Sequence, residues 1–95
     1  PCPFGHIGDG NLHYNILAPD SEAPAAFRAR AGEALIDAVS DLAMSMNGSF
    51  SAEHGIGQLR RAMMERYKPP EALALMRKLK TALDPDGMLN PGKVL

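Results

Sequence analysis

Side chains that can do chemistry gather in two short stretches of the sequence. His6 and His13 flank a glycine-rich turn, and Glu53 and His54 are neighbours further along the chain. Three imidazoles and a carboxylate suit a borderline divalent cation, such as zinc, manganese or iron, better than calcium or magnesium. An imidazole is also an effective general base near neutral pH. The four residues therefore indicate a metal-assisted or general-base site.

Each of these residues also has a purely structural interpretation. A lone histidine in a hairpin is usually a hydrogen-bonded surface or core residue, and a glutamate is usually a solvated or capping carboxylate. Two histidines opposed across one turn favour a joint role, because their geometry adds information that neither has alone. On the residues alone, both interpretations stay open.

Residues 4–17 predict the β-hairpin that positions the first two histidines. Asp9-Gly10 is a favoured two-residue turn, and the flanking residues alternate in polarity. This turn would place His6 directly opposite His13, with Cβ atoms about 4.5–5.5 Å apart. One face would carry Phe4, His6, Gly8, Asn11, His13 and Asn15. The other face, predicted to be core, would carry Ile7, Leu12, Tyr14 and Ile16.

The rest of the chain predicts helices and one more strand. Helical periodicity covers residues 24–46, 70–83 and the second half of 55–67, and Asn47-Gly48 ends the first helix. Residues 49–54 predict a short strand, and 84–87 a turn in the closing tail. The apolar stripe of the first helix is Phe27, Ala31, Leu35, Ala38, Leu42 and Met46, and the predicted buried stripe of the last is Leu73, Met76, Leu79 and Leu83. The expected fold is α+β: a small antiparallel sheet, made of the hairpin and a further strand, with about three helices.

Composition limits the partners of the chain. The 95 residues carry a formal net charge of -1, which gives no electrostatic basis for binding nucleic acid or an anionic membrane. No apolar run approaches the roughly 20 residues of a membrane span. Cys2 is the single cysteine, which excludes an intrachain disulfide and favours a reducing compartment, so we expect a cytoplasmic protein. The chain begins without Met, which indicates a fragment of a longer protein.

Three stretches together resemble a known family. FGHIGDGNLHYN, SAEHGIGQLRR and ALDPDGMLNPGKVL are similar, in that order, to the C-terminal domain of FAD-linked oxidases and dehydrogenases of D-2-hydroxy acids. That family belongs to the vanillyl-alcohol-oxidase-like superfamily and acts on acids such as 2-hydroxyglutarate, lactate and glycolate. The resemblance implies a flavoprotein oxidoreductase that converts the hydroxy acid to the 2-oxo acid with hydride transfer to FAD.

The resemblance also implies roles for individual residues. His6, His13 and Glu53 match ligands of a divalent metal, with zinc or manganese the metals we expect, and His54 matches the general base. Asn15 matches a substrate contact. Two residues of the tail, Asn90 and Lys93, match the segment that approaches the flavin.

Residues 1–95 would then form the C-terminal part of the substrate domain, without the FAD-binding domain. We expect residues 1–95 to be inactive alone. The partners expected for the parent protein are a small 2-hydroxy acid as substrate and an electron acceptor that reoxidises the flavin. Sheet edges left open by truncation would allow a homodimer. Two alternatives remain: a stand-alone metal-binding or interaction module without catalysis, and a small α+β domain whose histidines are structural.

Overall fold

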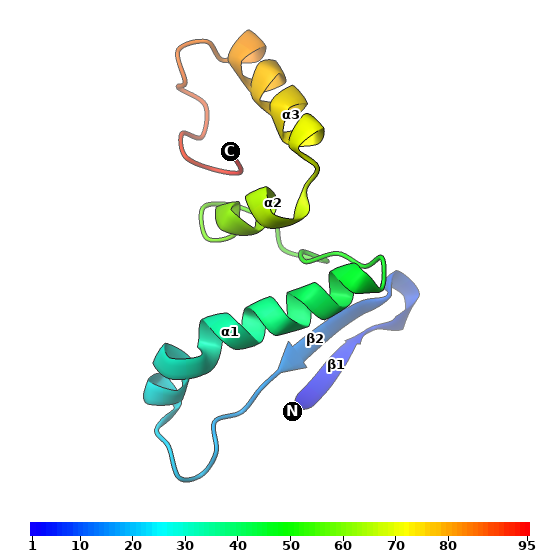
Figure 1. Cartoon of the computed structure of the whole chain (residues 1–95), viewed down its shortest axis with the longest axis vertical. Coiled ribbons are helices and arrows are strands. Elements are labelled where there is room, and N and C mark those ends of the chain that lie inside the picture. Colours follow the sequence, from blue (N-terminus) through cyan, green and yellow to red (C-terminus); the bar gives the residue numbers. More distant parts are fainter. The chain divides into compact units, whose positions relative to one another are not determined.

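The computed structural model describes all residues from 1 to 95. It divides into two compact units, Pro1–Glu53 and His54–Leu95. The first unit contains strands β1 (Cys2–His6) and β2 (Asn11–Asn15) and helix α1 (Pro24–Ser45). The second contains helices α2 (Arg61–Tyr67) and α3 (Pro70–Leu83) (Figure 1). A two-stranded antiparallel sheet with three helices confirms the expected α+β class.

The hairpin has a longer turn than the sequence predicted. A single 3₁₀ turn, η1 (Ile7–Asp9), joins the strands, and Gly10 closes it in the left-handed region at φ 62°. Because Ile7 and Gly8 leave the ladder, the register moves by two residues: His6 lies opposite Asn11, and His13 lies opposite Phe4. The predicted direct pairing of His6 with His13 is therefore wrong. A shift of two keeps the alternation of side chains, so the two histidines still share a face.

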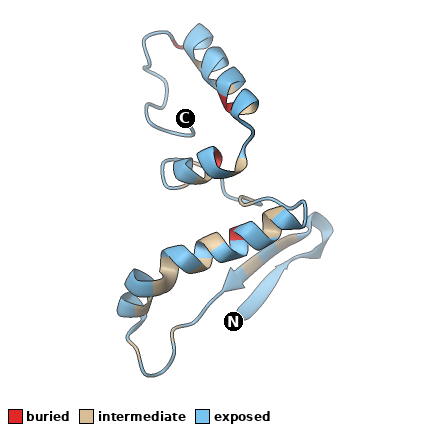
Figure 2. Cartoon of the chain, in the orientation of Figure 1, coloured by how far each residue is buried: buried red, intermediate tan, exposed pale blue.

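The apolar face of the hairpin is not core, contrary to the prediction. Leu12 and Tyr14 are 61% and 44% exposed, Ile7 is fully exposed, and Ile16 is also exposed. Figure 2 shows most of the hairpin in the exposed colour. The half-buried positions of β2 are Asn11 and His13, which belong to the polar face. In β2 the more covered side is thus the one that carries His13.

Helix α1 begins and ends where local signals predicted. Pro24 occupies its first turn, where the missing N–H costs nothing. Past its end, Asn47 takes a positive φ of 61° and the Gly48 N–H donates to the Ala43 carbonyl at 2.8 Å. The first half of the predicted stripe, Phe27, Ala31 and Leu35, is half-buried. The last three residues of the predicted stripe are exposed instead, namely Ala38, Leu42 and Met46.

Residues 49–54 form no strand, which corrects the predicted third strand. The Ser51 N–H donates to the Ser49 hydroxyl at 3.2 Å, and that hydroxyl lies 3.2 Å from the Ser51 carbonyl oxygen. Such local hydrogen bonds give serine-rich backbone an alternative to a ladder. The sheet therefore ends with β1 and β2.

The second unit packs two short helices around a very small core. Met64 of α2 and Leu73 of α3 are the buried apolar side chains, and Met76 is half-buried. Leu79 and Leu83, predicted to be buried, are exposed. Helix α2 has seven residues and α3 has fourteen, so the shorter helix cannot cover the second half of the longer one. None of the three helices has the length and apolar character that a membrane span needs.

The tail after α3 is fastened through Asp84, which is buried. Its carboxylate accepts hydrogen bonds from the Lys80 ammonium and from the N–H groups of Met88 and Leu89, the last two at 2.9 and 3.0 Å. The ion pair with Lys80, followed by the two backbone N–H donors, holds the pKa of Asp84 below its usual range. The Gly87 N–H donates to the Asp84 carbonyl at 3.1 Å, as the predicted turn requires.

Candidate functional site

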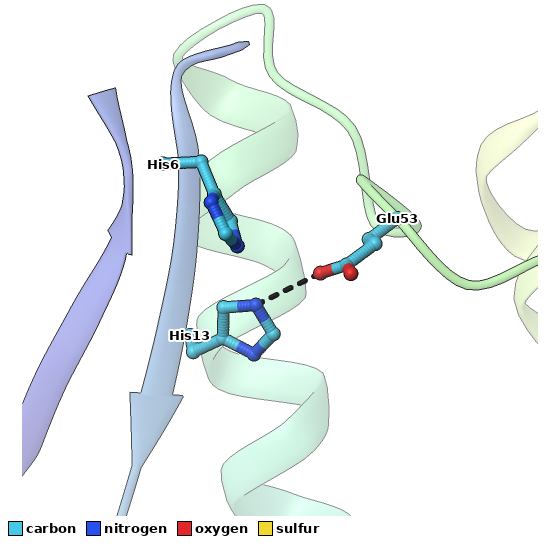
Figure 3. A group of neighbouring side chains, drawn as sticks. All are labelled: His6, His13 and Glu53. Carbon is cyan, nitrogen blue, oxygen red and sulfur yellow. Dashed lines mark ion pairs between the residues drawn. The ribbon is translucent and has the colours of Figure 1, made fainter. Parts of the chain in front are cut away.

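The first unit brings three of the predicted site residues together. His6 stands at the end of β1, His13 in the middle of β2, and Glu53 in the segment after α1. One possible ligand atom from each lies within 4.8 Å of the others. Figure 3 shows the two imidazoles and the carboxylate turned toward a common point. The geometry therefore agrees with the grouping predicted from the sequence, although the histidines meet diagonally across the ladder.

Hydrogen bonds connect Glu53 to the hairpin. Its Oε2 lies 2.8 Å from Nε2 of His13, and Nδ2 of Asn11 donates to the same oxygen at 3.1 Å. A neutral His13 makes this contact as the donor, with its proton on Nε2. Residues 42 positions apart in the sequence are thus tied together by their side chains.

Aromatic contacts hold the two imidazoles. The Phe4 ring stacks on the His13 ring with centroids 4.7 Å apart and planes 3° from parallel. The His6 ring meets His13 edge-on, with centroids 5.8 Å apart and an interplanar angle of 68°. The cross-strand register explains the stack, because Phe4 is the direct partner of His13.

The donor set fits a divalent metal ion. Zinc holds nitrogen and oxygen ligands at about 2.0–2.1 Å, so tetrahedral ligands lie about 3.3 Å apart. The separations here run from 2.8 Å between His13 and Glu53 to an upper bound of 4.8 Å within the group, and small side-chain rotations cover that difference. The side chains of His13 and Glu53 are 29% and 48% exposed, so an ion can reach them from solvent. An exposed pair of this kind contributes only about 0–1 kcal/mol to folding.

The other predicted site residues, Asn15, His54, Asn90 and Lys93, are all exposed to solvent. Asn15 ends β2 on the same face as His13. His54 follows Glu53 directly and begins the second unit. Asn90 has a positive φ of 47°, and its carbonyl accepts the Lys93 N–H at 3.3 Å. His54, Asn90 and Lys93 belong to the second unit, and the roles of all four residues stay predictions.

Two residues that contact the cluster have no role predicted from the sequence. Phe4 and Asn11 fall on the histidine-bearing face of the predicted hairpin, but without a function there. The alternation of polar and apolar residues is the signal in the sequence that could have found them. It puts Phe4 and Asn11 on the same face as His6 and His13, and a shift of the strand pairing by two residues does not change this. Only the correct turn length identifies which residue faces which.

Comparisons with known proteins agree on one family. The model of "FAD linked oxidases, C-terminal domain" matches residues 1–94. D-2-hydroxyglutarate dehydrogenase of Xanthomonas citri pv. viticola is 45% identical over 91 residues, which are 96% of this chain and 19% of that protein. The Stutzerimonas stutzeri enzyme of the same name is 42% identical with the same coverage. The mitochondrial enzyme of Bos taurus is 46% identical over 92 residues, 97% of this chain and 16% of that protein.

The chain spans about a fifth of the length of these bacterial relatives, 19% in each case. No solved structure gives a significant match. The family model covers all but the last residue, and the relatives align over nearly the whole chain. The chain therefore belongs to the family of FAD linked oxidases, through the match of residues 1–94 to the model of their C-terminal domain.

Proposed function

We propose that residues 1–95 act as the C-terminal part of a flavin-dependent dehydrogenase that oxidises a D-2-hydroxy acid to its 2-oxo acid. The observation that carries the proposal is the convergence of His6, His13 and Glu53 in a chain of this family. Among the candidate acids, D-2-hydroxyglutarate comes before lactate and glycolate, because the relatives named above are D-2-hydroxyglutarate dehydrogenases.

The three clustered residues would hold zinc or manganese. Two imidazoles and a carboxylate leave further coordination positions for substrate oxygens, as in catalytic sites with three protein ligands. A bound metal would supply Lewis-acid polarisation of the substrate hydroxyl. To bind the metal through Nε2, a neutral His13 would carry its proton on Nδ1 instead, and Glu53 would change from hydrogen-bond acceptor to a further ligand.

His54 would take the proton of the substrate hydroxyl. As that proton leaves, the C–O bond gains double-bond character and the hydrogen on C2 departs with its electron pair. FAD supplies the acceptor for that hydride. Asn15 would donate its amide N–H groups to the substrate carboxylate, an acceptor of matching chemistry. The imidazole of His54 later returns the proton to solvent.

Asn90 and Lys93 would contact the flavin from the tail. Two side chains of an exposed tail can contact a flavin but cannot enclose one, so residues outside these 95 would hold most of it. The exposed apolar face around Leu12 and Tyr14 also supports a working unit larger than this chain. We therefore expect no turnover from the 95 residues alone. A cytoplasmic location and a homodimer through the open strand edges remain predictions.

A chimera tests the proposed activity. The matching 91 residues of the Xanthomonas citri enzyme would be replaced by this chain, and flavin content and anaerobic flavin bleaching by D-2-hydroxyglutarate would be measured. We expect bleaching, with His54→Gln slowing it by about 10²–10⁴-fold at unchanged flavin content. Lys68→Gln, an exposed position outside the predicted site, serves as the control. A flavin-loaded chimera that D-2-hydroxyglutarate, lactate and glycolate all fail to reduce would refute the activity.

A metal-binding module without catalysis is the second candidate. It is favoured by one observation: the whole cluster lies within Pro1–Glu53 and needs no residue of the second unit. The chimera separates the two candidates. A metal-binding module predicts that the chimera binds metal and that His54→Gln leaves flavin reduction unchanged. The dehydrogenase predicts that the chimera binds metal and that His54→Gln slows flavin reduction.

A further inference from the structure

Two residues that contact the cluster take no part in the proposed chemistry. In the observed register Phe4 faces His13 and Asn11 faces His6, so the four residues form one block on a single face of the hairpin. We propose that Phe4 and Asn11 are positioning residues, which hold His13 and Glu53 in the arrangement that a metal requires. This inference rests on the metal site of the proposed function.

Phe4 controls the plane of the His13 ring. The second side-chain torsion of histidine is broad, so an exposed imidazole samples many ring orientations. A ring stacked 4.7 Å away and 3° from parallel restricts that torsion to orientations in which the edge of His13, not its face, points to Glu53. Phe4 is itself 56% exposed. Burial in a core therefore does not explain its place, whereas the contact with His13 does.

Asn11 controls the carboxylate of Glu53. Its amide N–H donates to Oε2, the oxygen that also faces Nε2 of His13. The hydrogen bond from His13 to Glu53 uses the proton on Nε2, which a metal bound at Nε2 would displace. This hydrogen bond therefore cannot hold the carboxylate once the metal is bound. The bond from Asn11 does not involve that proton and persists. Outer partners of this kind orient metal ligands and commonly change metal affinity about 10–100-fold when they are removed.

The test uses the 95-residue chain and Zn²⁺ as the probe. Phe4→Leu removes the stack, Asn11→Leu removes the donor at similar volume, and Phe4→Tyr keeps the ring. Tyr14→Leu is the matched control, because it removes an exposed aromatic ring from the opposite face of the same hairpin. Zinc affinity is measured by calorimetry. The NMR shifts of the His13 ring protons in the metal-free chain report whether Phe4 lies over the imidazole.

We expect Phe4→Leu and Asn11→Leu each to weaken zinc binding by about 10-fold or more. Phe4→Tyr and Tyr14→Leu should stay within about 2-fold of the unsubstituted chain, because neither loses a contact with His13 or Glu53. The His13 ring protons should show an upfield ring-current shift that disappears in Phe4→Leu and survives in Tyr14→Leu.

Three results would overturn the inference. They are the absence of a ring-current shift in the unsubstituted chain, zinc binding that neither leucine variant weakens, and equal weakening by Tyr14→Leu. Failure of the metal proposal looks different. If the shift is present and depends on Phe4 while the chain binds no zinc, the orientation of His13 by Phe4 is supported and the metal part of the proposed function is refuted.

Discussion

Gly5 is the position where one methyl group should disable the cluster. It lies on β1 between Phe4 and His6 and faces Leu12. A Cβ atom at Gly5 would lie 2.0 Å from the carbonyl oxygen of Asn11, and side-chain contacts of this kind essentially never fall under 3.0 Å. Both groups belong to the backbone ladder, so no side chain can rotate away. Gly5→Ala therefore forces the two strands apart by at least 1.0 Å, the difference between these distances.

A displacement of that size is large on the scale of a hairpin. Paired strands lie about 4.7–4.9 Å apart, and an N–H···O bond lengthened from about 2.9 to about 3.9 Å is lost. His6 is adjacent to Gly5 in the sequence and moves with it, whereas His13 stays with the other strand. The ligand atoms then separate by a comparable distance. We expect zinc affinity to fall at least 10-fold, which corresponds to about 1.4 kcal/mol.

Calorimetric zinc titration of three variants measures the effect. Gly8→Ala is the matched control, because the same substitution lies in the same hairpin and its Cβ meets no atom within 4 Å. The double variant His6→Ala, His13→Ala gives the signal of a chain without the clamp. Retention of the Gly5 to Leu12 cross-strand NMR contacts together with unchanged zinc affinity in Gly5→Ala would refute the close approach of the two strands at Gly5.

Two further predictions concern the second unit. Leu73→Ala should lower the free energy of unfolding by about 2–5 kcal/mol, because Leu73 is one of the two buried apolar side chains. Leu79→Ala, on the exposed side of α3, should change it little. Urea unfolding followed by circular dichroism measures both variants, and equal effects would contradict a core built on Met64 and Leu73. The pKa of Asp84 is lowered in the folded chain, so its contribution is present above its unfolded pKa of about 4 and is lost as the pH falls through the folded value. The protection factors of the Met88 and Leu89 amides against hydrogen exchange, which are corrected for the intrinsic pH dependence of the exchange rate, should therefore fall below about pH 4 and not between pH 5 and 8. Asp84→Asn should flatten that fall.

Local signals in the sequence predicted the helix ends well. Pro24, Asn47-Gly48 and Pro69-Pro70 act through the backbone of their own neighbours, and the structure places helix ends at or beside all three. The hairpin turn failed because Asp9-Gly10 fits both a two-residue loop and the end of a 3₁₀ turn, and only the pairing of the strands decides between them.

The predicted core failed for a different reason. Alternation at Leu12 and Tyr14 and the stripe through Leu79 and Leu83 show that these residues suit burial, but not what would bury them. All four are exposed, Leu12 at 61%, Tyr14 at 44%, Leu79 at 54% and Leu83 at 80%. Apolar patterning without burial agrees with the proposal that residues 1–95 act as part of a longer protein, and this chain spans 19% of the Xanthomonas citri relative.

Local sequence patterns could not predict that Glu53 approaches the histidines. The approach depends on two lengths in the first unit that must match, the length of β2 with the residues that follow it and the length of α1. β2 and the extended residues that follow it carry the chain away from the hairpin turn by about 30 Å over some nine residues. The 22 residues of α1 carry it back by about 33 Å. Figure 1 shows this return, with the end of α1 beside the turn of the hairpin. Helix length thus positions Glu53, and the helix stop at Asn47-Gly48, with no chemistry of its own, determines whether a third ligand reaches His6 and His13.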